Sequence, residues 1–180
     1  YFGYARQDRK AEGRVPITAK LVANLLVTSG IHRILALDLH AGQIQGFFDI
    51  PVDHLFASPV ILPYIKAHIR LDDLVIVTPD VGGVKMATAY AKRLKKDIAI
   101  IDKRREGPNR VEVRNVVGDV RDKSVFIIDD IISTGNSVLE AVKIVRENGA
   151  REVYIGGVHP VFANEAIKNL RRAEAKAILV

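Results

Sequence analysis

Short apolar runs alternate along the chain with amphipathic stretches of helical length. We predict strands at 33–38, 74–78, 98–102, 124–129, 152–159 and 176–180. Helices are predicted at 16–29, 59–68, 84–96, 137–148 and 164–171, and 112–117 is predicted to add an extended piece. Strands that alternate with helices across short connections are typical of βαβ units. The pattern therefore predicts an α/β fold built on a parallel sheet.

A domain boundary is predicted within residues 52–58. Residues 56–180 hold enough elements for a compact domain, whereas 1–55 are predicted to hold only about two, too few for a core of their own. The chain starts at Tyr1 without a methionine and ends on the apolar run 177–180. We therefore expect a fragment of a longer protein, with its first domain incomplete.

Composition narrows the classes of function. The absence of cysteine excludes a disulfide scaffold, thiolate catalysis and Cys-ligated zinc, and no uncharged apolar run approaches the roughly 20 residues of a membrane span. A net charge of +6 with only 6% aromatic residues favours small anionic ligands over nucleic acid. Two cationic loops, 6–14 and 103–110, would attract phosphates. We expect a cytoplasmic protein.

The segment 125–137 carries the clearest chemistry. Asp129 and Asp130 follow the apolar run 125–128, and hydroxyl, amide and glycine groups then open a helix at Ser133, Thr134, Gly135, Asn136 and Ser137. A helix N-terminus favours an anion, and paired carboxylates can accept sugar hydroxyls or hold a hydrated divalent cation. The pattern indicates a sugar-phosphate site. The alternative is an Asp pair that caps a turn in an ordinary α/β protein.

An aspartate also marks the end of each of the first two predicted strands: Asp38 is the last residue of the first, and Asp80 follows the second. Ligands of open α/β sheets bind at the carboxyl ends of strands, so these positions are candidates for a site. His40 and Asp80 could bind Mg²⁺ directly or through its waters. Equally, His40 could be a hydrogen-bonded histidine, and Asp80 before two glycines could be simple turn chemistry.

Two polar segments complete the candidates. Arg6 can fork onto phosphate oxygens, and Gln7 can bond a purine edge or a ribose. Residues 102–110 lack any apolar period and are predicted to form a cationic flap that closes over a polyphosphate. Composition alone does not separate either segment from a solvated surface loop.

Taken together and in order, these strings resemble ribose-phosphate diphosphokinase, also called phosphoribosyl-diphosphate synthetase. The matching segments are 4–8, 16–20, 38–41, 43–53, 79–83, 102–105, 117–120 and 129–137. The resemblance implies a phosphoribosyltransferase-like (type I) α/β fold with helices on both faces of a parallel sheet, and two similar tandem domains in the full protein. It also implies a homo-oligomer of dimers that assemble into a hexamer.

The implied reaction is transfer of the β,γ-diphosphoryl group of MgATP to the C1 hydroxyl of ribose 5-phosphate, with AMP released. The resemblance implies ATP binding by Arg6 and Gln7, Mg²⁺ binding by His40 and Asp80, and catalysis by Lys103 and Arg105. It implies ribose 5-phosphate binding by Arg105, Asp129, Asp130, Ser133, Thr134, Gly135, Asn136 and Ser137.

Three departures from the family pattern stand out. Ser133 replaces an aspartate and removes a negative charge near the phosphate, while Asn136 replaces a glycine and would accept a left-handed backbone less freely. Residues 10–14 also differ, which bears on adenine recognition.

Two rival functions remain open. A phosphoribosyltransferase would share the 129–137 motif but needs neither Arg6 and Gln7 nor Lys103. A catalytically silent regulatory homologue is disfavoured by intact His40 and Lys103.

Overall fold

The structure, a computed structural model, describes residues 1–10, 12–105 and 112–180, with the backbone alone described for 103–105 and 112–114. The chain forms two compact units, Tyr1–Ala57 and Ser58–Val180, and each is described here by itself. None of the helices in these ranges is long and apolar enough to cross a membrane.

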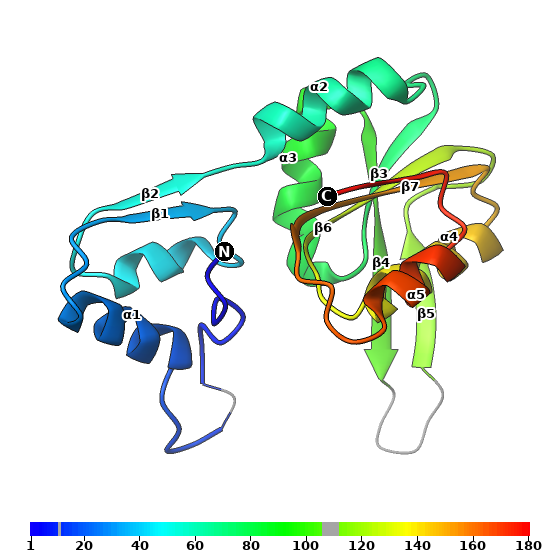
Figure 1. Cartoon of the computed structure of the whole chain (residues 1–180). Coiled ribbons are helices and arrows are strands. Elements are labelled where there is room, and N and C mark those ends of the chain that lie inside the picture. Colours follow the sequence, from blue (N-terminus) through cyan, green and yellow to red (C-terminus); the bar gives the residue numbers. More distant parts are fainter. Residues whose placement is uncertain (11, 106–111) are drawn as a thin grey trace. The chain divides into compact units, whose positions relative to one another are not determined.

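The larger unit is built on a six-stranded sheet with the order β5-β4-β3-β6-β7-β8 (Figure 1). The strands are β3 (Leu74–Thr78), β4 (Asp97–Arg105), β5 (Glu112–Val117), β6 (Ser124–Ile132), β7 (Glu152–Pro160) and β8 (Ala177–Leu179). All neighbours pair in parallel except β4 and β5, which are antiparallel. The α/β fold with a mostly parallel sheet is therefore confirmed.

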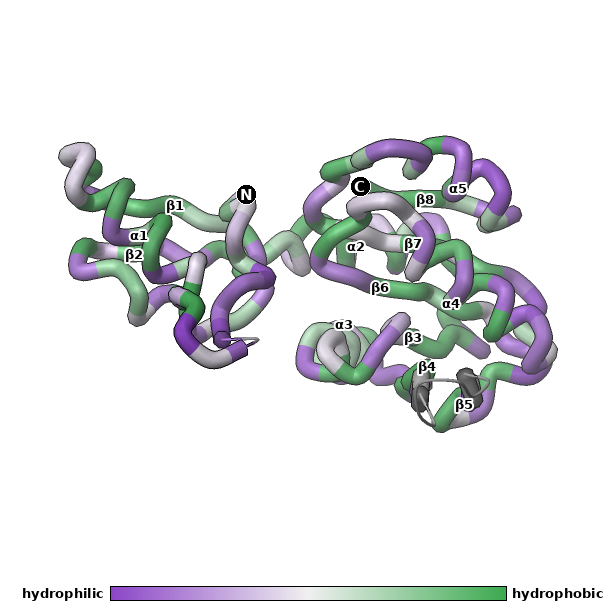
Figure 2. The backbone as a smooth tube through the Cα atoms, turned by 90° about the horizontal axis from the view of Figure 1, so that it is seen from below, coloured by the Kyte–Doolittle hydropathy of each residue, from purple (hydrophilic) through white to green (hydrophobic). Residues whose placement is uncertain are grey.

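Helices cover both faces of this sheet, as Figure 1 shows. They are α2 (Ser58–His68), α3 (Val84–Leu94), α4 (Asn136–Glu147) and α5 (Ala166–Arg172), with a short 3-10 turn, η2 (Val81–Gly83), before α3. Ile76 and Phe126 face α2 and α3, whereas their neighbours Val77 and Ile127 face α4 and α5, because successive strand side chains point to opposite faces. Buried on both sides, β3 is apolar from Leu74 to Val77 and β6 from Val125 to Ile128 (Figure 2).

Two strands are longer than their apolar runs predict. β6 stays paired with β7 as far as Ile132, so Asp129 and Asp130 lie within the strand rather than after it. Strand β4 continues to Arg105 because it pairs with β5, so the prediction of a loop starting at Lys103 is wrong at its first three residues. Residues 106–111 of the predicted flap lie outside the described residues.

The smaller unit contains α1 (Thr18–Thr28), β1 (Ile34–Leu37), the 3-10 helix η1 (Gly42–Phe47) and β2 (Val52–Leu55). Strands β1 and β2 pair in parallel. Ala23 of α1 and Ile44 of η1 are buried in its core together with Ala5 and Phe48. The expectation of only about two elements here is wrong, because β2 lies inside the segment that was predicted to be a boundary.

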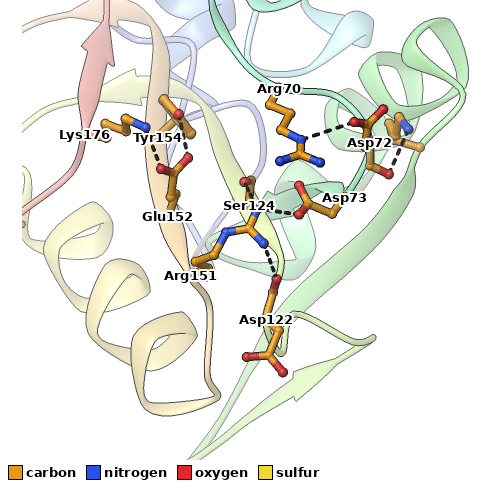
Figure 3. Close-up of polar contacts among 10 residues, drawn as sticks. Arg70, Asp72, Asp73, Asp122, Ser124, Arg151, Glu152, Tyr154 and Lys176 are labelled. Atoms are coloured by element: carbon orange, nitrogen blue, oxygen red, sulfur yellow. Dashed lines mark hydrogen bonds and ion pairs between the residues drawn. The ribbon is translucent and has the colours of Figure 1, made fainter.

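Polar contacts fix the edge of the large sheet where its parallel strands begin (Figure 3). The Arg151 guanidinium pairs with Asp73, which precedes β3, and it donates to the Asp122 carbonyl at 3.0 Å. The hydrogen bond from Arg151 holds the pKa of Asp73 below its usual value. Glu152 accepts from the Tyr154 hydroxyl at 2.9 Å and pairs with Lys176. The candidate site residues of this unit lie toward the opposite ends of the strands.

Candidate functional site

The carboxyl ends of β3 and β6 carry the predicted site residues of the larger unit. Asp80 follows β3, Asp129 and Asp130 lie in the second half of β6, and the turn 133–135 leads directly into α4. Since β3 and β6 are adjacent and parallel, their carboxyl ends share one edge of the sheet. The fold therefore gathers on one edge the carboxylates and the turn that the sequence singled out.

A network around Thr78 fixes the turn after β3. The Thr78 hydroxyl is fully buried and donates to the Asp80 carbonyl at 2.8 Å. Asp80 then caps η2, its Oδ1 accepting from the Gly83 N–H at 3.2 Å. Asp80 thus has the turn-forming role that was its alternative interpretation. The other carboxylate oxygen of Asp80, Oδ2, takes no part in this capping bond.

Gly83 is required by close approach to Thr78. A Cβ atom at position 83 would lie 2.2 Å from the Thr78 Oγ1. We predict that Gly83→Ala breaks the bond from Thr78 to Asp80 and destabilises the full-length protein by about 1–3 kcal/mol, seen as a lower Tm in thermal unfolding. Gly46→Ala is the control, because nothing lies within 4 Å of a Cβ there. Equal melting temperatures for the two variants would contradict the prediction.

Asp129 is the most perturbed titratable group of the site. Burial, followed by the hydrogen bond and negative charge of Asp130 and the charge of Asp80, raises the pKa of Asp129 to about 8. The backbone N–H of Asp130 donates to Asp129 Oδ1 at 2.9 Å and offsets a part of this effect. Three carboxylates thus repel one another at this edge, and a cation or a set of hydroxyl donors would relieve the repulsion.

The turn into α4 depends on Gly135. Its φ of 74° is left-handed, and a Cβ atom would lie 3.2 Å from the Ala166 carbonyl. Asn136 is already the first residue of α4 and is absent from the left-handed positions of the described backbone. The expected conflict between asparagine and a left-handed backbone at position 136 is therefore wrong, since the glycine that needs this conformation is one residue earlier.

This turn presents free backbone donors. Among the residues that the structure describes, none accepts a hydrogen bond from the N–H of Thr134 or of Gly135. The Asn136 N–H donates to the Thr134 hydroxyl at 3.5 Å, whereas the next N–H groups in the first turn of α4 have no partner within the helix, and the helix dipole is positive there. With the hydroxyls of Ser133 and Ser137 beside them, these groups form an arrangement suited to a phosphate.

Asn169 on α5 is a residue of this region that the sequence analysis missed. Its side-chain Nδ2 donates to the Thr134 carbonyl at 2.9 Å and to Asn136 Oδ1 at 2.7 Å. A faint signal was available in the sequence, because Asn169 is the polar member of a face whose other residues, Ala166, Leu170 and Ala173, are apolar and buried. Its partners are 33 and 35 residues away and could not be inferred from that pattern.

The smaller unit carries the other predicted residues. Arg6 and Gln7 are exposed, and the Gln7 carbonyl accepts from Ala19 at the start of α1 at 3.1 Å. His40 is exposed in the turn after β1. That turn is held by Asp38, whose Oδ2 accepts from the Ala57 N–H at 2.7 Å, and by His54, whose Nε2 accepts from the Leu39 N–H at 3.0 Å.

The sequence analysis did not identify His54 as a candidate.

Residues 10–14 are the segment where the sequence departs from the family pattern, and residue 11 of this segment lies outside the described residues.

The metal and catalytic candidates are only partly described. Within the described ranges, no group of three or more His, Cys, Asp or Glu side chains is placed to hold a metal ion. His40 and Asp80 belong to different units, so each is described alone. Backbone pairing places Lys103 opposite Arg114 and Arg105 opposite Glu112, while the side chains of these residues lie outside the description.

Comparisons with known proteins cover nearly the whole chain. Residues 64–175 match the Phosphoribosyl transferase domain family, and residues 1–30 match the N-terminal domain of ribose phosphate pyrophosphokinase. Similar curated proteins include the ribose-phosphate pyrophosphokinases of Gloeobacter violaceus, 52% identical over 181 residues, and of Bacillus caldolyticus, 53% identical over 180 residues. Both matches cover 100% of this chain but 54% and 57% of those proteins, so the chain spans about half their length.

Solved structures agree with these matches. The crystal structure of phosphoribosylpyrophosphate synthetase from Mycobacterium smegmatis superposes with a TM-score of 0.92 at 42% identity, over 99% of this chain and 58% of that one. A purine phosphoribosyltransferase from Pyrococcus horikoshii Ot3 superposes with a TM-score of 0.52 at 17% identity, over 83% of this chain and 87% of that one, which shows a shared fold.

Proposed function

Because this chain belongs to the phosphoribosyl transferase domain family, and within it to the ribose-phosphate pyrophosphokinases, we propose that the full-length protein makes 5-phosphoribosyl 1-diphosphate for nucleotide biosynthesis. The reaction transfers the β,γ-diphosphoryl group of MgATP to the C1 hydroxyl of ribose 5-phosphate. A bond forms between the C1 oxygen and the β-phosphorus, the bond from that phosphorus to the α-phosphate oxygen breaks, and the hydroxyl loses its proton. AMP leaves.

The observation that carries the proposal is one sheet edge that combines a carboxylate pair with a turn whose Thr134 and Gly135 N–H groups have no acceptor among the described residues. In the proposed complex the turn 133–137 binds the 5-phosphate. Asp129 and Asp130 accept hydrogen bonds from the ribose hydroxyls. Hydroxyl donors favour the ionised carboxylate, so sugar binding would lower the raised pKa of Asp129.

Mg²⁺ fits the donors that this chain offers. It usually binds proteins through one or two carboxylates and completes its shell with water and substrate phosphates, so a cluster of three protein ligands is not required. We propose that Asp80 and His40 hold it, directly or through water. When bound, Mg²⁺ neutralises negative charge on the transferring diphosphoryl group.

The remaining residues of the proposed site bind ATP and stabilise charge. Arg6 and Gln7 bind ATP, Lys103 and Arg105 neutralise the diphosphoryl group during transfer, and Arg105 also contacts ribose 5-phosphate. No covalent intermediate with the enzyme is needed, because holding the two substrates in line and balancing their charge lowers the barrier. A homo-oligomer of dimers that assemble into a hexamer, and a cytoplasmic location, stay predictions.

The proposal is tested by following AMP release from the full-length protein supplied with MgATP. We expect AMP to appear only when ribose 5-phosphate is present, and to stop when EDTA removes the magnesium. AMP release at the same rate without ribose 5-phosphate would show an ATP hydrolase and contradict the proposal.

A further inference from the structure

We propose that Asn169 is a positioning residue that holds the turn 133–137 in the conformation that receives the 5-phosphate of ribose 5-phosphate. The inference rests on the proposed function of that turn. Asn169 lies on α5, outside the motif, and is only 8% exposed. Its two donated hydrogen bonds, of 2.9 Å and 2.7 Å, both end on the turn.

The orientation of the Asn169 amide follows from its partners. The Thr134 carbonyl can only accept, so the Asn169 group that faces it at 2.9 Å must be the NH₂. The second amide hydrogen then points to Asn136 Oδ1. Both hydrogens of a buried amide are thus used on one loop, which is the satisfied arrangement that buried polar groups require.

The bond to Thr134 determines where the next backbone donor points. In a trans peptide the C=O and the following N–H point in opposite directions. Because the Thr134 carbonyl is turned toward α5, the N–H of Gly135 points away from it, on the side of the turn that α5 does not cover. A carbonyl released from Asn169 could rotate and take this N–H away from the phosphate.

The bond to Asn136 keeps a competing acceptor away from the helix start. Asparagine near a helix N-terminus readily bonds the free backbone N–H groups with its own side-chain oxygen. Here that oxygen accepts from Asn169 instead, at 2.7 Å. The Asn136 N–H already donates to the Thr134 hydroxyl at 3.5 Å, but the Ser137 N–H, for which the described residues offer no acceptor, stays available to an external anion.

Helix α5 is a firm support for these bonds. Leu170 of α5 and Ala173 directly after it are buried in the same core as Val138 and Val142 of α4. The segment before α5 is also tied to the turn, because the Ala163 N–H donates to the Ser133 carbonyl at 3.0 Å. Asn169 thus links the turn to a fixed part of the fold.

The test measures substrate binding to the full-length Asn169→Leu variant, in which the side chain keeps its approximate volume but loses both donors. We expect the Kd for ribose 5-phosphate, measured by titration calorimetry, to rise about tenfold, while the Kd for MgATP stays within about twofold of wild type. Lys168→Ala is the matched control on the same helix, because Lys168 is exposed and pairs with Glu165. It should bind both ligands like wild type.

Two results would overturn the inference. One is an unchanged Kd for ribose 5-phosphate, and the other is an equal loss of affinity for both ligands, which would indicate general damage to the fold. If Asn169→Leu does not fold, Asn169→Ser decides, because one hydroxyl hydrogen cannot serve both the Thr134 carbonyl and Asn136 Oδ1, and a Kd for ribose 5-phosphate equal to wild type there overturns the inference. Failure of wild type to bind ribose 5-phosphate would instead count against the proposed function.

Discussion

Replacing Asp129 with asparagine should make the ligand-free protein more stable at neutral pH while weakening its binding of ribose 5-phosphate. In the folded chain the pKa of Asp129 is about 8, mainly through burial and the neighbouring Asp130 and Asp80, whereas an unfolded aspartate titrates near 4. The folded state therefore binds this proton more tightly. This proton stabilises the folded wild type fully below about pH 4, and the stabilisation is lost as the pH rises toward 8.

Asparagine does not titrate, so the stability of the variant does not fall with pH through this position. The Tm difference, variant minus wild type, should grow between pH 5 and pH 8 and level off above it. Each unit of pKa shift corresponds to about 1.4 kcal/mol, so the difference in unfolding free energy reaches on the order of a few kcal/mol. Asp97→Asn is the control, because Asp97 is exposed at the start of β4, and its Tm should follow wild type at each pH.

Binding should change in the opposite direction. The neutral amide is a weaker acceptor for sugar hydroxyls than a carboxylate, so we expect the Kd of Asp129→Asn for ribose 5-phosphate to rise by about tenfold or more. A variant that gains no stability between pH 5 and pH 8 would show that Asp129 is not strained in the free protein. A variant that binds ribose 5-phosphate like wild type would remove Asp129 from the sugar site.

Replacing Lys103 with alanine should lower turnover by about 10²–10³-fold, with little change in the Kd for ribose 5-phosphate. The proposed role of the ammonium group is to neutralise charge that develops on the diphosphoryl group during transfer. A residue that acts mainly in the transition state affects kcat more than ground-state binding. The backbone of Lys103 lies in β4, paired with β5, which gives this residue a defined starting point.

Lys92→Ala serves as the control for a lost lysine, because Lys92 is exposed in the last turn of α3. Its turnover should equal that of wild type under the same conditions. If Lys103→Ala also turns over at the wild-type rate, Lys103 has no part in the transfer.

The positions of strands could be predicted from the sequence where the strand is a continuous run of buried residues. The bounds of β3, Leu74–Thr78, were predicted in full, because five buried residues lie between polar or turn-forming neighbours. β2 was missed because Asp53 and His54 break its apolar pattern. Those two side chains bond Arg33 and the Leu39 N–H instead of entering a core, so their contacts depend on the folded unit.

Site residues that are adjacent in the sequence could also be predicted, whereas a residue that holds them from a distant part of the sequence could not. The carboxylates and the turn at 129–137 follow one another in the sequence, so their meeting on one sheet edge could be predicted from the strand and helix around them. Asn169 reaches the same turn only because α5 packs beside α4. The sequence named Asn136 as the unusual residue, but only the fold shows which side chain binds it.

The most direct test of the proposed diphosphoryl transfer is ³¹P NMR of the full-length protein mixed with MgATP and ribose 5-phosphate. We expect the ATP signals to give way to a single AMP signal and to two coupled signals of a diphosphate attached at C1, in equal amounts. Formation of ADP with a ribose that carries separate phosphates at C1 and C5 would show transfer of a single phosphoryl group and contradict it. So would a protein that leaves this mixture unchanged but releases diphosphate from 5-phosphoribosyl 1-diphosphate when a purine or pyrimidine base is added.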